Sequence, residues 1–151
     1  MALPKLDSPI YETELPSTNE KIKYRPFLVK EQKLLMLAQE SKDQNETVQA
    51  MTQLINSCTF GKIDATTTPI FDIEYLFLKI RGKSVGEKVK VQVTCPDDNK
   101  TKVPVDINLE DINIQMTVGH TNELKISDKI KMIMKYPILG DVLDAKGGES
   151  E

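Results

Sequence analysis

The chain has 151 residues, of which 20 are basic and 23 acidic, giving a formal net charge of −3. This length is typical of one domain that can bury a hydrophobic core without stabilising disulfides or metal ions. Four Tyr, four Phe and no Trp are too few for a base-stacking platform, and the acidic balance argues against a general nucleic-acid binder. With one His and two Cys, residues suited to catalysis are scarce. Composition therefore favours a binding or structural module.

Targeting signals and paired cysteines are not evident in the sequence. The N-terminal segment has no apolar run of the secretory type, and no stretch approaches the ~18 apolar residues of a membrane span. We therefore expect no membrane contact. Cys58 and Cys95 lie far apart without CxxC spacing. This pattern predicts reduced cysteines on apolar faces, with a disulfide or a shared metal as the alternative.

The N-terminal region predicts an extended arm and then a β-hairpin. Residues 1–9 are Pro-rich and polar, which is typical of an arm. Apolar and charged residues then alternate over 11–15 and over 22–26, on either side of the turn-forming residues 16–20.

The next region predicts three helices. Residues 30–41 and 46–58 carry apolar residues at helical spacing, and the short polar break between them suggests an antiparallel pair. A third helix is predicted to follow Thr67, Thr68 and Pro69, with a threonine as the capping residue and Gly82 as the C-cap.

From Gly86 the apolar period changes to two, which predicts strands. Residues 89–95 and 103–109 alternate around the turn 96–100, so we expect a hairpin with one buried face, and Pro104 places its second strand at an edge. Alternation over 112–116 suggests a third strand, while 124–136 fits either a strand or a helix. Residues 141–151 are predicted to be a disordered tail.

The expected fold class is α+β, with one domain over residues 1–140. A small antiparallel sheet would combine the N-terminal hairpin with a hairpin or meander over 87–116, and about three helices would pack on it.

No residue group predicts a catalytic, cofactor or metal site. His120 lies in a polar linker and is expected to be exposed or locally bonded. Cys95 and the following Pro-Asp-Asp resemble half a zinc knuckle or a calcium loop, but a hairpin turn prefers the same residues. No Gly-rich phosphate loop is present. The basic residues between Lys79 and Lys90 fit a solvated face better than a phosphate site.

Two apolar runs exceed what one helix face can bury. Leu34–Leu37 and Tyr75–Leu78 each cover more than one face of their predicted helix. A single globule could bury both runs, and a subunit of an assembly could bury the surplus against partners. Both interpretations remain open at this stage.

Five segments give the sequence a family resemblance. They are Met1–Leu6, Lys23–Lys33, Phe71–Lys79, Ser84–Lys88 and Thr94–Asp98. In this order they resemble the baseplate hub proteins of T4-like tailed bacteriophages, and the similarity runs to about Pro137. Family members are longer, which suggests a shorter homologue or a fragment.

The resemblance implies a non-enzymatic structural or assembly subunit of the central hub of a contractile tail baseplate. Its partners would be other hub, spike and tail proteins, without small-molecule substrate or cofactor. It would occur in the host cytoplasm during assembly, and in the virion tail if retained. A transient hub-assembly chaperone is the main alternative. A small enzyme using a carboxylate or Cys95, and a nucleic-acid or peptide adaptor, are further ones.

Aromatic, Met and Arg residues are enriched at protein interfaces. On this basis the predicted interface includes Tyr24, Arg25, Phe27, Leu35, Met36, Tyr75 and Phe77.

Overall fold

A computed structural model describes residues 8–41 and 43–141 of the chain. The predicted arm at 1–9 and tail at 141–151 lie outside these residues, apart from residues 8–9 and 141. No statement about either segment is tested by the structure.

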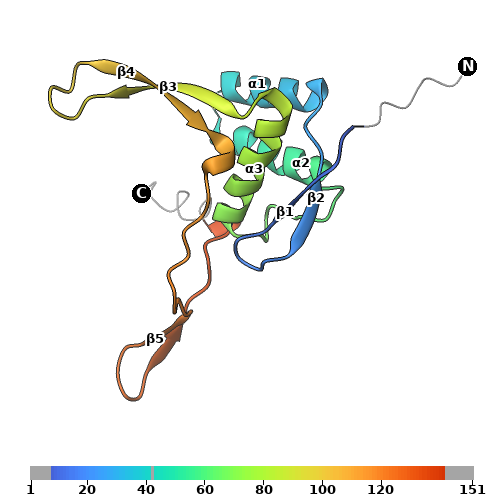
Figure 1. Cartoon of the computed structure of the whole chain (residues 1–151). Coiled ribbons are helices and arrows are strands. Elements are labelled where there is room, and N and C mark those ends of the chain that lie inside the picture. The colour runs from blue at the N-terminus through green and yellow to red at the C-terminus, as the bar shows by residue number, and fades with distance from the viewer. Residues whose placement is uncertain (1–7, 42, 142–151) are drawn as a thin grey trace, which may run out of the picture.

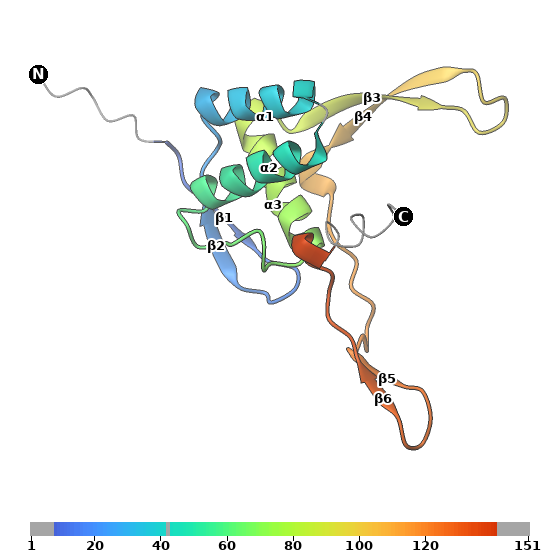
Figure 2. The same ribbon diagram turned by 180° about the vertical axis from the view of Figure 1, so that it is seen from behind.

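The described residues form three long α-helices, a helical turn at 139–141 and three antiparallel two-stranded sheets, so the α+β class is confirmed (Figure 1). The elements are β1 (Tyr11–Glu14), β2 (Lys21–Tyr24), α1 (Val29–Ser41), α2 (Gln44–Cys58), α3 (Ile70–Val85), β3 (Lys88–Thr94), β4 (Lys102–Asn108), the 3₁₀ helix η1 (Leu109–Asp111), β5 (Glu123–Lys125) and β6 (Lys131–Ile133). The helices and the β1–β2 hairpin make a compact body, from which β3–β4 and β5–β6 extend in different directions (Figures 1 and 2).

The core lies between α2, α3 and the β1–β2 hairpin. Leu54, Ile55 and Cys58 share one face of α2, and Leu76 and Ile80 share one face of α3, because residues three or four apart stack on a helix. The buried cluster comprises Leu15, Ile22, Tyr24, Leu54, Ile55, Cys58, Ile63, Ala65, Ile73, Leu76 and Ile80.

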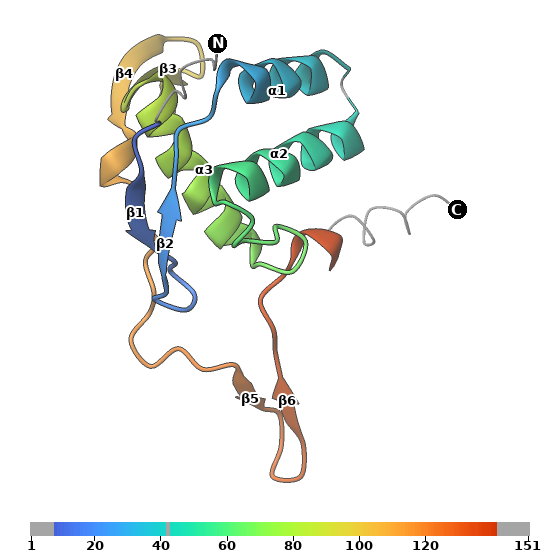
Figure 3. The same ribbon diagram turned by 90° about the vertical axis from the view of Figure 1, so that its right-hand side faces the viewer.

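Helices α1 and α2 form the predicted antiparallel pair, with α3 beside one end of it in Figure 3 and behind it in the view of Figure 2. Asp43 caps α2, because its carboxylate accepts a hydrogen bond from the backbone N–H of Asn45 at 2.8 Å. The α2 helix therefore begins two residues earlier than the sequence pattern predicted.

Both predicted ends of α3 need correction. The hydroxyls of Thr67 and Thr68 donate to the carbonyl of Asp64, so neither threonine caps the helix, and Pro69 takes the N-cap position. At the other end, the helix continues through Gly82, which is buried beside Leu109. Gly86, with φ of 133°, is the residue that ends it.

The β1–β2 hairpin is confirmed, and its turn is tied to the start of α3. Asp72 is fully buried and accepts hydrogen bonds from the backbone N–H of Ser17, at 3.1 Å, and from the Ser17 hydroxyl. A negative charge in the first turn of α3 also complements the helix dipole. Within the hairpin, the rings of Tyr11 and Tyr24 face each other at 5.8 Å.

The β3–β4 hairpin is confirmed as an element, but its predicted buried face is wrong. Its register pairs Val89 with Ile107, Val91 with Val105 and Val93 with Val103. These side chains form one apolar face that is exposed or half-buried, because the hairpin extends away from the helices (Figure 2). Residues 112–116 form no strand, so the sheet does not continue into a meander.

The ambiguous stretch 124–136 proves to be a second projecting hairpin, β5–β6. Leu124 pairs with Met132, and the chain then returns to the body. There the backbone N–H of Ile70 donates to the carbonyl of Pro137 at 3.1 Å. Ile138 forms an isolated β-bridge with Pro69.

Candidate interaction surfaces

The outer face of α1 exposes large apolar side chains. Val29 is 82% exposed, Met36 is 55% exposed and Leu37 is 53% exposed. Leu34 is also exposed, whereas Leu35 and Ala38 turn towards the body. The apolar side chains of the Leu34–Leu37 run that one helix face cannot bury therefore lie on the surface of the chain.

The seven predicted interface residues are divided between core and surface. Tyr24 is buried in the core, and this burial raises the pKa of its phenol. Phe27, Leu35 and Phe77 are half-buried and pack against the same core. Of the seven, Met36 is the residue with the largest apolar exposure.

Arg25 has an internal partner. Its guanidinium Nη2 lies 2.8 Å from Oε1 of Glu31, and the other Glu31 oxygen accepts the backbone N–H of Leu28 at 2.6 Å. The Leu28 bond is the half of a capping box that an acidic residue supplies at the start of α1. Burial alone would raise the pKa of the Glu31 carboxyl, but the bonds from Arg25 and Leu28 outweigh it and lower that pKa. Arg25 therefore compensates a buried charge.

Tyr75 lies at the edge of the body, half-buried. The Lys79 ammonium stands 5.0 Å from the centre of its ring, a distance typical of a cation–π contact. The predicted surface at Tyr75 and Met36 thus comes from two different helices.

Sequence reasoning missed the apolar face of β3–β4 as an exposed surface. Val93 and Val103 are each about half exposed, and Val105 and Ile107 are also exposed. The alternation of apolar and polar residues predicted an apolar face on this hairpin. It cannot show whether the rest of the chain covers that face or whether the hairpin projects into solvent.

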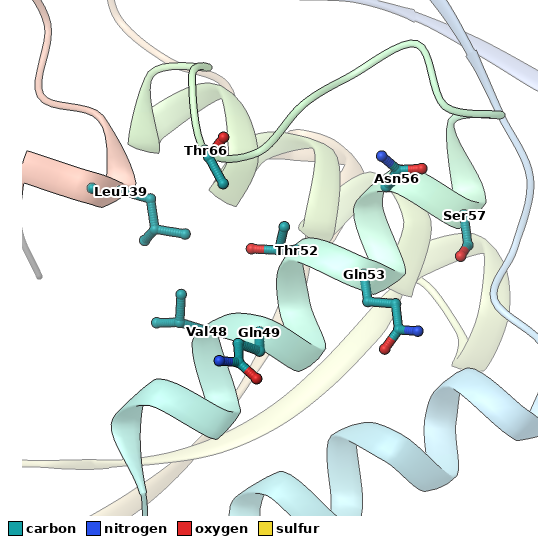
Figure 4. Close-up of a pocket in the computed structure, with 9 residues that line it drawn as sticks. Val48, Gln49, Thr52, Gln53, Asn56, Ser57, Thr66 and Leu139 are labelled. Atoms are coloured by element: carbon teal, nitrogen blue, oxygen red, sulfur yellow. The ribbon is translucent and has the colours of Figure 1, made fainter.

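A groove opens between α2 and the segment that returns from β6. Figure 4 shows Val48 and Thr52 of α2 facing Thr66 and Leu139. The groove holds about 600 Å³ and is lined by apolar, amide and hydroxyl side chains. The described residues that line it are all uncharged, so this part of the chain offers an uncharged concave surface.

Two of the basic residues near α3, Lys79 and Lys83, have local partners. Lys83 bonds to Glu87 at 2.6 Å and also to Glu110, which ties the end of α3 to the base of β3–β4. Lys79 donates to the Glu110 carbonyl. These two lysines of the basic run therefore have a structural role, because they join α3 to the residues at the base of β3–β4.

Asp98, in the turn over residues 96–100, and His120 each contact neighbouring residues. Asp98 accepts hydrogen bonds from the backbone of Lys100 and from Thr101, and these bonds lower the Asp98 pKa to about 2. His120 is exposed and stacks on Tyr136 at 5.8 Å. Within residues 8–41 and 43–141, no group of three or more His, Cys, Asp and Glu side chains is placed to hold a metal ion.

Both cysteines are free, and their surroundings differ. Cys58 is fully buried on the apolar face of α2, as predicted, and burial raises the pKa of its thiol to about 11. Cys95 is half-buried at the end of β3. In the described part of the chain, no helix is both long and apolar enough to cross a membrane.

The fold and its surfaces define a small α+β protein that displays apolar side chains on α1 and on a projecting hairpin. Comparison with protein families gives a more specific result, because the family model described as T4 bacteriophage base plate protein matches residues 8–150. The chain belongs to this family, which indicates a structural role in a phage baseplate, in contact with other baseplate proteins. Comparisons with curated proteins and with solved structures gave no significant match.

Proposed function

We propose that the chain is a non-enzymatic structural subunit of the central hub of a contractile phage tail baseplate, close to the spike. It acts by protein–protein contact. The observation that supports this most is the exposed apolar face of α1, on a chain that belongs to a baseplate family. The five segments that resemble hub proteins support the hub as its location.

The α1 face supplies part of the binding energy of such a subunit. Fully burying a Leu or Met side chain contributes about 1.5–3 kcal/mol. Leu34, Met36 and Leu37 are already about half buried, so covering them adds roughly 1 kcal/mol each. A micromolar complex needs about 8 kcal/mol. The subunit must therefore use more than one surface, as a protein held among several neighbours does.

Charge substitutions on α1 test whether this face is used. Met36→Glu and Leu37→Glu place a charge where a partner would bury the side chain, while Gln39→Glu is a control at an exposed polar position of the same helix. We expect all three chains to show the same helical content by circular dichroism. In a phage that lacks the natural gene, the first two should fail to complete tails and the control should succeed. Full rescue by all three would contradict the proposal.

Cross-linking mass spectrometry tests the hub location. Lys30 and Lys33 on the exposed start of α1 are suitable anchors in assembled baseplates. We expect their cross-links to reach hub and spike proteins. Cross-links confined to proteins of the baseplate periphery would contradict a hub position. Loss of the chain from mature tails that need it for assembly would instead make it an assembly chaperone.

A further inference from the structure

The two edges of the β3–β4 hairpin differ in their ability to accept another strand. In an antiparallel ladder, pairs that exchange hydrogen bonds alternate with pairs whose N–H and C=O groups point away. The backbone N–H of Leu109 donates to Glu87 at 2.7 Å, and that of Cys95 donates to Thr101 at 2.8 Å. These two bonds fix which pairs are hydrogen-bonded along the whole hairpin.

Between those ends, the bonded pairs are the apolar ones. By alternation they are Val89 with Ile107, Val91 with Val105 and Val93 with Val103. The intervening pairs direct their backbone N–H and C=O groups away from the partner strand, towards the outer edges of the hairpin. These pairs are Lys88 with Asn108, Lys90 with Asp106 and Gln92 with Pro104.

Pro104 therefore closes one edge and leaves the other open. Proline has no N–H, and at this position the missing donor belongs to the outer edge of β4 rather than to the ladder with β3. On the β3 edge, Lys88, Lys90 and Gln92 retain their outward N–H groups. Among the described residues, β4 is the one strand that pairs with β3.

The charge on the open edge selects the partner. Lys88 and Lys90 are exposed on the polar face of β3, a strand that carries no acidic residue. Asp106 of β4 is the cross-strand neighbour of Lys90, but neither lysine forms an ion pair within the described part of the chain. Pairing β3 with β3 of a second copy would gather four lysines on one face, with no acid on either of the two strands. Lysine on a strand edge disfavours such self-pairing.

We propose that the free edge of β3 binds an extended strand from another protein, with apolar residues on one face and acidic residues on the other. The strand would hydrogen-bond to the backbone at Lys88, Lys90 and Gln92 and extend the exposed apolar face of the hairpin. Its acidic side chains would lie beside the two lysines. This mode is β-strand addition, in which backbone bonds give affinity and side chains give specificity. It rests on the proposed function only in that the strand belongs to a tail protein.

A synthetic peptide of the same length as β3, with valine and glutamate alternating, is the probe. Its control replaces glutamate with lysine. In the ¹⁵N-labelled full chain, we expect the glutamate peptide to slow amide hydrogen exchange at Lys88, Lys90 and Gln92, and the lysine peptide to bind about tenfold more weakly. Absence of protection, equal binding of both peptides, or protection of the β4 edge would overturn the inference. So would self-association of the chain with the same amides protected.

Two matched pairs of variants test the edge assignment. Gln92→Pro removes an outward donor from β3 and should abolish peptide binding, whereas Asp106→Pro makes the same change on the β4 edge and should preserve it. Lys90→Glu should weaken binding of the glutamate peptide several-fold, and Lys102→Glu on β4 should leave it unchanged. This second pair of variants keeps the test valid if a proline substitution disrupts the hairpin. If Lys90→Glu and Lys102→Glu bind alike, the inference fails. Co-purification of the wild-type chain with tail proteins tests the proposed function separately, so the two can fail independently.

Discussion

Replacing Arg25 with methionine is expected to destabilise the fold, because Arg25 neutralises Glu31 inside the body. The Glu31 side chain is 4% exposed and that of Arg25 is 14% exposed, so this ion pair is largely shielded from water. Methionine keeps the length and apolar packing of the arginine stem but removes the charge. Glu31 would retain the bond from the backbone N–H of Leu28 and the solvent-exposed Lys30 ammonium at 3.9 Å, but would lose its closest cation.

The expected cost is about 3 kcal/mol. Removing one partner of a buried pair costs about 3–5 kcal/mol, and the surviving Leu28 bond places this case at the lower end. With a urea m-value of about 2 kcal/mol/M, the unfolding midpoint should fall by roughly 1.5 M. Urea titration followed by circular dichroism at pH 7 measures both quantities.

The matched control removes the charge on the other side of the pair. In a Glu31→Gln chain, no buried anion remains, so adding Arg25→Met should cost less than about 1 kcal/mol. The pH dependence has a defined sign. Because the folded-state pKa of Glu31 is lowered, its contribution is present above the unfolded pKa and is lost as the pH falls through the folded value. A cost below about 0.5 kcal/mol, or an undiminished cost in the Glu31→Gln background, would refute this reasoning.

Three further predictions concern the core, the α3 terminus and the cysteines. Leu76→Ala leaves a cavity at a fully buried site and should lower the free energy of unfolding by about 2–5 kcal/mol in urea titrations. Gly86→Ala should cost about 1–3 kcal/mol, because φ of 133° is strained for alanine although its Cβ meets no neighbour; an unchanged midpoint would show that the backbone relaxes. With iodoacetamide at pH 8, Cys95 should react in the native chain, while Cys58 should react only on unfolding, because it is buried and its pKa is about 11. Peptide mapping detects the order, and equal rates would contradict it.

The sequence predicted the elements better than their surroundings. The three helices and the N-terminal and central hairpins follow from period and turn chemistry, which are local properties. The sequence predicts Gly82 as a C-cap, but α3 continues past it to Val85, and a Cβ at Gly82 would meet Leu109 only at an ordinary contact distance, so this glycine marks no helix end. The central hairpin alternates as a half-buried sheet does, yet nothing in its residues says whether the body covers it.

For a related reason, the sequence did not predict which of the candidate interface residues are exposed. Residue type suggested Tyr24 and Arg25, but type does not reveal that one fills the core and the other compensates Glu31. The Leu34–Leu37 run was informative because four consecutive apolar residues exceed one helix face, so part of the run must face outwards. The edge defined by Pro104 required the strand register, which the sequence does not fix.

Quantitative mass spectrometry of purified mature tails tests the central claim most directly. Isotope-labelled peptides from the chain and from a hub protein of known copy number would give its amount in each baseplate. A structural hub subunit should be present at a fixed, whole-number ratio to the hub protein, and the ratio should survive stringent purification. Absence from mature tails, or an amount well below one copy in each baseplate, would contradict the account.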